Sequence, residues 1–391
     1  MDEFPITCQR CREQSVGASS LAPWVRRSLF VTIAISLALL AFPLAANAAN
    51  ATTQNTFPIK RFSVDGEALS IAWSPDGQRL AVSSQNYARV TIWNPETGAI
   101  LQQLQRGMGF GKSLAFTPDG KYILTSAAQQ KTDEDQHTSL SVWDLATGTV
   151  VQNLQGTYPS MGLNSNIADV LALDRISGKL AAIIHGGSGG GHVGIYDTST
   201  WKLARDFGVN QDAQVSVAFS PNGKLLALGT VRGRIAIFNT SDWALAHIVD
   251  AYAGGDSTLG VISLAFSPDS RLIVSGPITN GRRQPDGHYG PMPDALRIWN
   301  TESGELDRTL PLSLAEQSTE EVRGIAWSPD GRHIASTSSD RAVRLWDIEK
   351  PDSPIIITTF SKTAWNAAFS PDGSRLAVTG DEAVIVVEIA Q

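Results

Sequence analysis

The chain has 391 residues, of which 42% are hydrophobic and 18% charged, with 34 glycines and 19 prolines. This is the composition of a globular protein, and it excludes a collagen-like or an intrinsically disordered chain. Lysine and arginine total 31 against 38 aspartate and glutamate residues, a net charge of −7. The chain lacks the basic surplus of a nucleic-acid-binding protein, so no nucleic acid partner is expected.

The length would suit two or three domains of ~150 residues, but no linker divides the middle of the chain, which favours one large or repetitive domain.

The first 48 residues have the order of a secretory signal peptide. Arg26 and Arg27 precede an apolar run at residues 29–42, and a string of small residues ends at Ala48. This order predicts cleavage after Ala48, a short linker at residues 49–58 and a periplasmic or secreted protein without stable membrane insertion. The alternative is an uncleaved membrane anchor, which requires ~20 uninterrupted apolar residues. The paired arginines leave open Sec or twin-arginine export.

Both cysteines, Cys8 and Cys11, lie in this segment. Two cysteines are too few for a disulfide framework, and one Cys-x-x-Cys pair supplies only half of a four-ligand zinc site. Cleavage after Ala48 removes both, so the mature protein is expected to fold without disulfides.

A four-residue pattern, Ser/Thr-Pro-Asp-Gly, recurs along the rest of the chain. Proline sets φ at the second turn position, aspartate can accept a hydrogen bond from its own turn, and glycine tolerates positive φ. The pattern therefore predicts a tight turn between two strands wherever it occurs. A degenerate seventh copy lies at residues 170–178. The six clear copies are Ser74–Gly77, Thr117–Gly120, Ser220–Gly223, Ser267–Ser270, Ser328–Gly331 and Ser370–Gly373.

Two further columns recur with the turns. An alanine between larger apolar residues precedes each turn, and an aromatic residue followed by Asp or Asn comes some 20 to 30 residues later in six of the units. Each of the first six units contains four short alternating apolar stretches, and the repeat as a whole predicts seven four-stranded antiparallel sheets. The third column is Trp93, Trp143, Tyr196, Phe238, Trp299, Trp346 and the divergent Val387.

The recurring turns and the aromatic pairs resemble the WD-repeat family of β-propellers, from about Ile59 to the end of the chain. The resemblance implies an all-β fold, a single seven-bladed β-propeller over residues 59–391, of bacterial type given the expected export. Repeat spacing places four tryptophans in the blade core. The Gly-His pair usual for the family is missing from every unit, and unit 6 comes closest to the full His-Ser-Asp-Trp set with Ser338, Asp340 and Trp346. The four tryptophans are Trp93, Trp143, Trp299 and Trp346.

The seventh unit contains only three of the four stretches. Residues Ile59–Phe62 match the fourth-strand pattern of Leu101–Leu104. We therefore expect the N-terminal strand to complete the last blade, which would leave no open edge between the two ends of the ring.

Insertions between strands two and three, and between units, fall on one face of a four-stranded meander, and loops on a rigid scaffold are where binding concentrates. The longest, residues 281–291, carries residue types suited to interface anchors: Arg282, Arg283, His288 and Tyr289. The alternative is a solvated loop. Four further residues just precede first strands, and the family resemblance implies that they ring the channel mouth: Lys112, Asp169, Arg323 and Trp365.

The leading hypothesis is a non-enzymatic scaffold in the cell envelope, a monomeric propeller that binds a protein or peptide within a larger complex. No cofactor or catalytic set is expected, because no nucleophile, base and orienting acid stand out in the sequence. The innermost column lacks His, Asp and Glu, which argues against a metal in the channel and leaves loop ligands open. The alternatives are a propeller enzyme, either a metal-dependent hydrolase or a quinone-dependent dehydrogenase, and a non-catalytic subunit of an envelope enzyme complex. The column reads Ser70, Ser113, Val170, Ser216, Ser263, Gly324 and Asn366.

Overall fold

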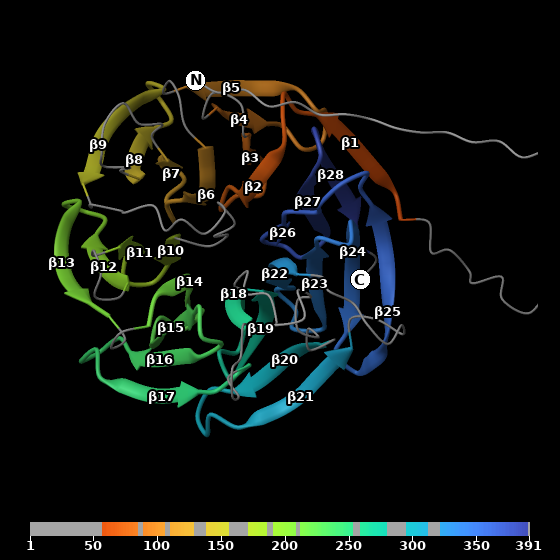
Figure 1. Cartoon of the computed structure of the whole chain (residues 1–391). Helices are drawn as coiled ribbons and strands as arrows, with labels where there is room; N and C mark the ends of the chain where they lie inside the picture. Colours follow the sequence, from red (N-terminus) through yellow and green to blue (C-terminus); the bar gives the residue numbers. More distant parts are fainter. Residues whose placement is uncertain are drawn as a thin grey trace, which may run out of the picture. The chain divides into compact units, whose positions relative to one another are not determined.

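The computed structural model separates two units, Met1–Gln54 and Asn55–Gln391. It describes residues 57–84, 89–105, 110–128, 138–155, 171–185, 191–208, 212–252, 259–279, 295–311 and 321–389, all in the second unit. These residues form strands and turns with no helix, in seven four-stranded antiparallel sheets arranged as blades around a central axis (Figure 1). The predicted seven-bladed, all-β propeller is confirmed.

Blades are numbered in chain order of their first strands, which lie innermost. Blade 1 contains β2 (Ala68–Trp73), β3 (Leu80–Ser84), β4 (Arg89–Trp93) and β5 (Ile100–Gln105). Blade 2 contains β6 (Phe110–Phe116), β7 (Tyr122–Ala128), β8 (Thr138–Asp144) and β9 (Thr149–Gln155). Blade 3 contains β10 (Leu171–Asp174), β11 (Lys179–His185), β12 (Gly191–Asp197) and β13 (Lys202–Phe207). Blade 4 contains β14 (Gln214–Phe219), β15 (Leu225–Thr230), β16 (Ile235–Asn239) and β17 (Leu245–Val249).

The last three blades follow the same order. Blade 5 contains β18 (Leu259–Phe266), β19 (Leu272–Thr279), β20 (Ala295–Asn300) and β21 (Leu306–Pro311). Blade 6 contains β22 (Val322–Trp327), β23 (His333–Ser338), β24 (Ala342–Asp347) and β25 (Lys350–Thr359). Blade 7 contains β26 (Asn366–Phe369), β27 (Arg375–Gly380) and β28 (Ala383–Glu388), and its fourth strand is β1 (Ile59–Ser63).

The recurring four-residue pattern forms the turn between first and second strands. In the first copy, the Ser74 hydroxyl donates to Asp76 Oδ1 over 2.5 Å, Asp76 Oδ1 also accepts from the backbone N–H of Gln78, and Gly77 takes a φ of +69°. The same Ser/Thr–Asp/Asn bond recurs in the other five copies. In the degenerate copy, Asp174 replaces the serine and accepts from the Ile176 backbone N–H. Hydrogen bonds between neighbouring residues thus determine the conformation of each turn.

The hydrophobic core consists of layers between neighbouring blades. The buried apolar side chains divide into seven clusters, each shared by two adjacent blades. In one of them, Val274 and Leu296 of blade 5 pack with Ile334 and Trp346 of blade 6. Because each blade buries both of its faces against neighbours, no blade can hold its apolar surface out of water by itself.

The ring is closed by β1, the strand that comes first in the chain. It pairs antiparallel with β28, from Ile59 opposite Val387 to Ser63 opposite Ala383. The ring of Phe62 also stacks on Trp93 of blade 1 at 5.6 Å. The expected closure by the N-terminal strand is therefore confirmed.

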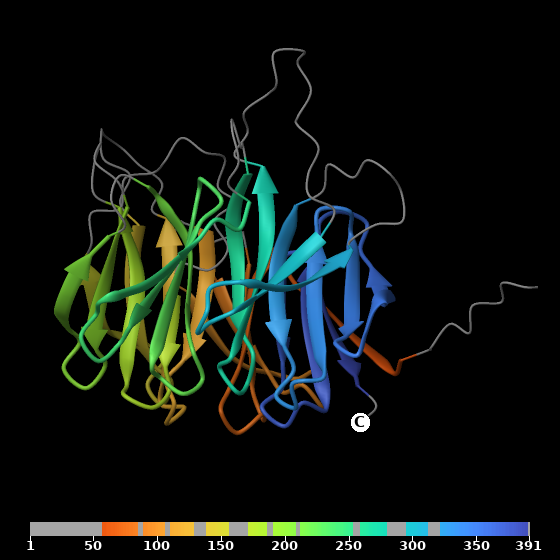
Figure 2. The same ribbon diagram turned by 90° about the horizontal axis from the view of Figure 1, so that it is seen from below.

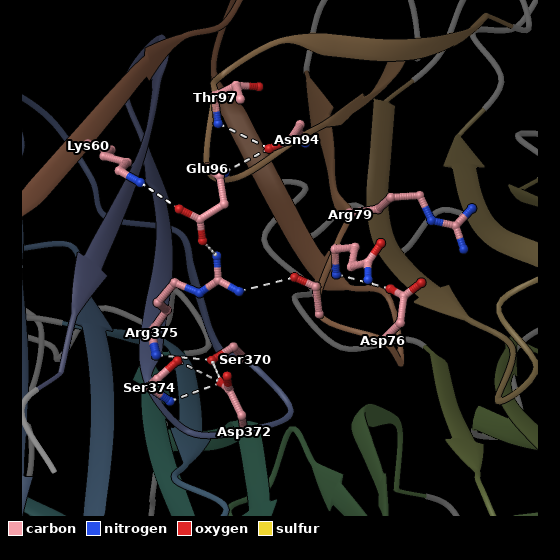
Figure 3. A network of polar contacts seen from close by, with 12 residues as sticks. Lys60, Asp76, Arg79, Asn94, Glu96, Thr97, Ser370, Asp372, Ser374 and Arg375 are labelled. Atoms are coloured by element: carbon pink, nitrogen blue, oxygen red, sulfur yellow. Dashed lines mark hydrogen bonds and ion pairs between the residues drawn. The ribbon is translucent and has the colours of Figure 1, made fainter.

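A polar network crosses the same boundary between blades 7 and 1 (Figure 3). The Glu96 carboxylate, in the β4–β5 turn, accepts from Lys60 Nζ at 2.9 Å and from Arg375 Nη1 at 2.5 Å. Arg375 Nη2 reaches across to the Gly77 carbonyl oxygen at 3.2 Å. The Glu96 side chain is 62% exposed, so these ion pairs contribute little beside the strand pairing and the apolar layer.

The four repeat-spaced tryptophans are all buried, but their indole nitrogens are not all satisfied. Trp143, Trp299 and Trp346 each donate from Nε1 to a hydroxyl on the neighbouring second strand, over 3.0 to 3.1 Å, and the acceptors are Thr125, Ser275 and Ser336. Trp93 Nε1 has no acceptor among the described residues. At the matching position of β3, blade 1 has Val82, which offers no hydroxyl.

The indole bonds give a matched pair of predictions. Thr125→Val leaves Trp143 Nε1 buried without an acceptor, so we expect the free energy of unfolding to fall by about 1–2 kcal/mol. Val82→Thr supplies Trp93 with the missing acceptor and should leave stability unchanged or raise it by up to about 1 kcal/mol. Urea denaturation midpoints, compared at constant m-value, measure both. Equal losses in the two variants would contradict this account.

Ring closure gives a second prediction. Deleting residues 57–63 removes β1 and opens the layer between blades 7 and 1, so the melting temperature should fall by about 10 °C, given ~1.4 °C per kcal/mol for a ring of ~330 residues and several buried side chains at ~1.5–3 kcal/mol each. A deletion that ends at Thr56 is the control. Differential scanning calorimetry compares the two, and melting of both within one or two degrees would refute closure by β1.

Candidate functional site

The two ends of the propeller carry different connections. Turns between first and second strands, and between third and fourth strands, gather at one end, here called the turn face, at the lower edge of Figure 2. Links between second and third strands, and from blade to blade, leave from the opposite end, the loop face. Turn-face links are uniformly short, whereas loop-face links range from residues 381–382 to residues 280–294. Variation in link length is therefore concentrated on the loop face.

The aspartates of the recurring turns on the turn face are hydrogen-bonded within those turns. The Ser370 hydroxyl lowers the pKa of Asp372 to about 2, helped by the Ser374 backbone N–H and hydroxyl. The pKa values of the equivalent aspartates are lowered too, with bonds from their turns as a cause in each: Asp76, Asp119, Asp269 and Asp330. These carboxylates are ionised at neutral pH and already hydrogen-bonded, which suits turn stability rather than ligand capture.

On the loop-face end of the innermost strands, five blades share a β-bulge. The register shifts by one residue at the same position in β2, β6, β14, β18 and β22. A bulge takes one residue out of the ladder and redirects its side chain. The extra residues are Leu69, Lys112, Val215, Ile262 and Arg323.

The bulge corrects the expected position of two candidate residues. Lys112 and Arg323 lie inside β6 and β22 rather than just before them. Trp365 does precede its strand, β26, and its backbone N–H donates to the Thr379 carbonyl oxygen at 2.8 Å. Asp169 and the side chain of Lys112 lie outside the described part of the chain, so the candidate site is built on Arg323 and Trp365.

Arg323 is a buried cation between blades 6 and 7. Its side chain is 8% exposed, its Nη2 forms an ion pair with Glu321, and its guanidinium carbon lies 5.1 Å from the centre of the Trp365 ring. Burial lowers the pKa of the Arg323 guanidinium, and the Glu321 carboxylate opposes that shift. Among the described residues, Nε and Nη1 find no hydrogen-bond acceptor. Within the described part of the chain, the site thus holds a charged group with two donor nitrogens that lack an acceptor.

Asp340, in the adjacent β23–β24 link, contacts Ser338 and Arg344. Trp346 donates to Ser336, and not to Ser338. The Ser338 hydroxyl instead accepts from the Asp340 backbone N–H at 3.1 Å, while Asp340 pairs with Arg344. Ser338 and Asp340 therefore bond to each other, while Trp346 bonds separately to Ser336.

Blade 7 contributes a second buried charge to the loop face. Asp381, between β27 and β28, is 8% exposed and accepts from the Ser361 hydroxyl and from the Lys362 backbone N–H. Its Oδ1 has no donor among the described residues. Asp381 thereby ties the β25–β26 link to the β27–β28 link beside Trp365.

Several predicted groups cannot be placed in this site. Arg282, Arg283, His288 and Tyr289 lie in the link between β19 and β20, outside the described residues. Where the chain is described, no group of three or more His, Cys, Asp or Glu side chains is arranged to hold a metal ion. No helix in that part of the chain has the length and apolarity needed to cross a membrane.

Part of the chain matches a known protein family. The family described as WD40, "WD domain, G-beta repeat", matches residues 308–347, which run from β21 through β24. The matched segment spans the last strand of blade 5 and the first three strands of blade 6. Residues 308–347 thus resemble a WD40 repeat and lie within a seven-bladed β-propeller.

Relatives of this WD40-repeat propeller extend the match to other blades. The guanine nucleotide-binding protein subunit beta of Arabidopsis thaliana is 23% identical over 72% of this chain and 80% of its own length. SEC12-like protein 2 of Arabidopsis thaliana is 25% identical over 56% of this chain and 51% of its own length. Protein transport protein sec13 of Aspergillus oryzae is 29% identical over 47% of this chain and 64% of its own length.

The names and organisms of these relatives can be compared with the expected bacterial type and with the expected absence of enzyme activity. The chain spans about half to two thirds of the length of the SEC12-like and sec13 proteins. All three relatives are eukaryotic proteins, so they do not support the expected bacterial type. None of their names describes an enzyme, and one names a subunit, which is a component of an assembly.

Sequence reasoning missed Glu321, Arg344 and Asp381. The sequence did contain one signal for Glu321. Arg323 is charged, whereas the equivalent residues of blades 4 and 5 are the apolar Val215 and Ile262. The acidic residue two positions before that arginine is the natural first candidate for its counter-ion. Asp381 gave no such signal, because its partners Ser361 and Lys362 lie about twenty residues away in another link.

Proposed function

We propose that the WD40-repeat propeller is a non-enzymatic scaffold that binds a protein or peptide partner through its loop face. The observation that carries the proposal is the contrast between the two ends. On the turn face the aspartates and Asn222 of the recurring turns are hydrogen-bonded within those turns. On the loop face Arg323 lies over Trp365, and its Nε and Nη1 have no acceptor among the described residues. Arginine and tryptophan are the residue types most enriched among the energetic anchors of protein interfaces.

The longest loop-face link supports the same proposal from the sequence. Residues 280–294 join β19 to β20 and include two arginines, a histidine and a tyrosine. We expect Arg282, Arg283 and Tyr289 to contact the partner, because loops carried on a rigid scaffold are where binding concentrates.

Co-purification tests this function. Tagged protein is recovered from its native cells as wild type, with Arg282, Arg283 and Tyr289 changed to Ala, and with Asp269→Asn as a turn-face control. The loop-face variant should lose at least about 90% of the partner, the effect of removing ~1.4 kcal/mol or more of binding energy, while the control retains it. Equal recovery by the loop-face variant and wild type would remove this link as the anchor, and loss only in the control would move the site to the turn face.

We further propose that the propeller works outside the cytoplasm, in the periplasm or as a secreted protein, after removal of residues 1–48. The support is the order of basic pair, apolar run and small-residue string that ends at Ala48. The intact mass of the native protein should correspond to a chain that begins at Ala49. A mass that includes residues 1–48 in a soluble cytosolic fraction would contradict the proposal.

A further inference from the structure

The unused donors of Arg323 call for an explanation. A guanidinium with 8% of its side chain exposed, and with no acceptor for Nε or Nη1 among the described residues, leaves costly desolvated donors behind. Buried polar groups in folded proteins are nearly always paired, and an exception usually marks a ligand, a water or a functional strain.

The fold itself does not require a charge at this position. Val215 and Ile262 occupy the same bulge position in blades 4 and 5, and both are buried. An apolar side chain therefore satisfies the bulge, and Arg323 adds a desolvation cost that packing alone does not explain. Recognition of an anion is the ordinary use of such an arginine.

Glu321 already shows which anion the site accepts. Its carboxylate pairs with Arg323 Nη2, and its backbone is fixed to the next link by two hydrogen bonds with Ser339, at 2.9 and 3.0 Å. Glu321 directly follows residues 312–320, the link from blade 5 to blade 6 on the loop face. Trp365, from blade 7, holds the guanidinium by a cation–π contact that does not depend on Glu321.

We infer that Arg323 is a receptor for a carboxylate of the partner, and that Glu321 is an internal stand-in that a partner carboxylate displaces or joins. The inference rests on the proposed function, because it names the chemistry recognised at the loop face. A carboxylate is the same chemical group as the present occupant, and guanidinium–carboxylate hydrogen bonds are charge-assisted. The partner carboxylate belongs either to an acidic side chain or to a chain end.

Chemical rescue tests this inference without the partner. Glu321→Ala removes the internal occupant, and melting temperatures are measured with N-acetyl-glutamate amide, which carries a side-chain carboxylate, and with N-acetyl-glycine, which carries a terminal one. N-acetyl-glutamine amide is the uncharged control, and sodium chloride keeps ionic strength constant. At about ten times its dissociation constant, a carboxylate probe should raise the melting temperature by about 2 °C. Wild type should need a higher probe concentration for the same shift, because Glu321 competes.

A matched variant makes the result specific to the guanidinium. Arg323→Leu in the Glu321→Ala background copies the apolar bulge of blades 4 and 5, so it should fold and lose the rescue. Glu321→Gln keeps the side-chain volume, and it replaces Glu321→Ala if that variant does not fold. Rescue by either carboxylate probe that Arg323→Leu abolishes supports the inference and shows which source fits. Equal melting temperatures with probe and with chloride overturn it, whatever the co-purification experiment shows.

Discussion

The antiparallel pairing of β1 with β28 is the contact on which the remaining structure depends. Every blade buries two apolar faces, one against each neighbouring blade. Seven blades in a ring therefore have seven apolar layers between them, but blades that follow one another along the chain form only six. The seventh forms because β1 leaves the start of the propeller and completes blade 7, which places Phe62 on Trp93. Without it, two blades would expose apolar surface and two sheet edges would be free to pair with other chains.

The repeat was predictable because its determinants are local. Each Ser/Thr-Pro-Asp-Gly turn contains its own hydrogen-bond partners, so blade number, turn positions and the degenerate turn at Asp174 could be read from neighbouring residues. Choices between distant hydroxyls were not predictable in this way. Trp346 bonds Ser336 and not Ser338, a selection made by the register of β23 against β24. The β-bulge that includes Lys112 and Arg323 in their strands is likewise a property of strand pairing.

The contacts of the candidate site could not be predicted from the sequence either. Arg323 and Trp365 were selected because they flank innermost strands, but the sequence could not bring them together, since that contact depends on neighbouring blades lying side by side. Glu321 and Asp381 escaped notice because burial gives them their significance. An arginine beside a glutamate in an exposed loop is unremarkable. The same pair at 8% and 16% side-chain exposure makes a site whose charge balance matters.

Ring closure by β1 also delays the completion of blade 7 during synthesis. β1 emerges first during synthesis and β28 last, so β1 waits for about 320 residues before its partner exists. At ~5–20 residues per second this delay is on the order of 20 to 60 s. Throughout that period β1 has no native edge to join, and blade 1 has no neighbour on one side. Blade 7 therefore becomes four-stranded, and the ring closes, only at the end of synthesis.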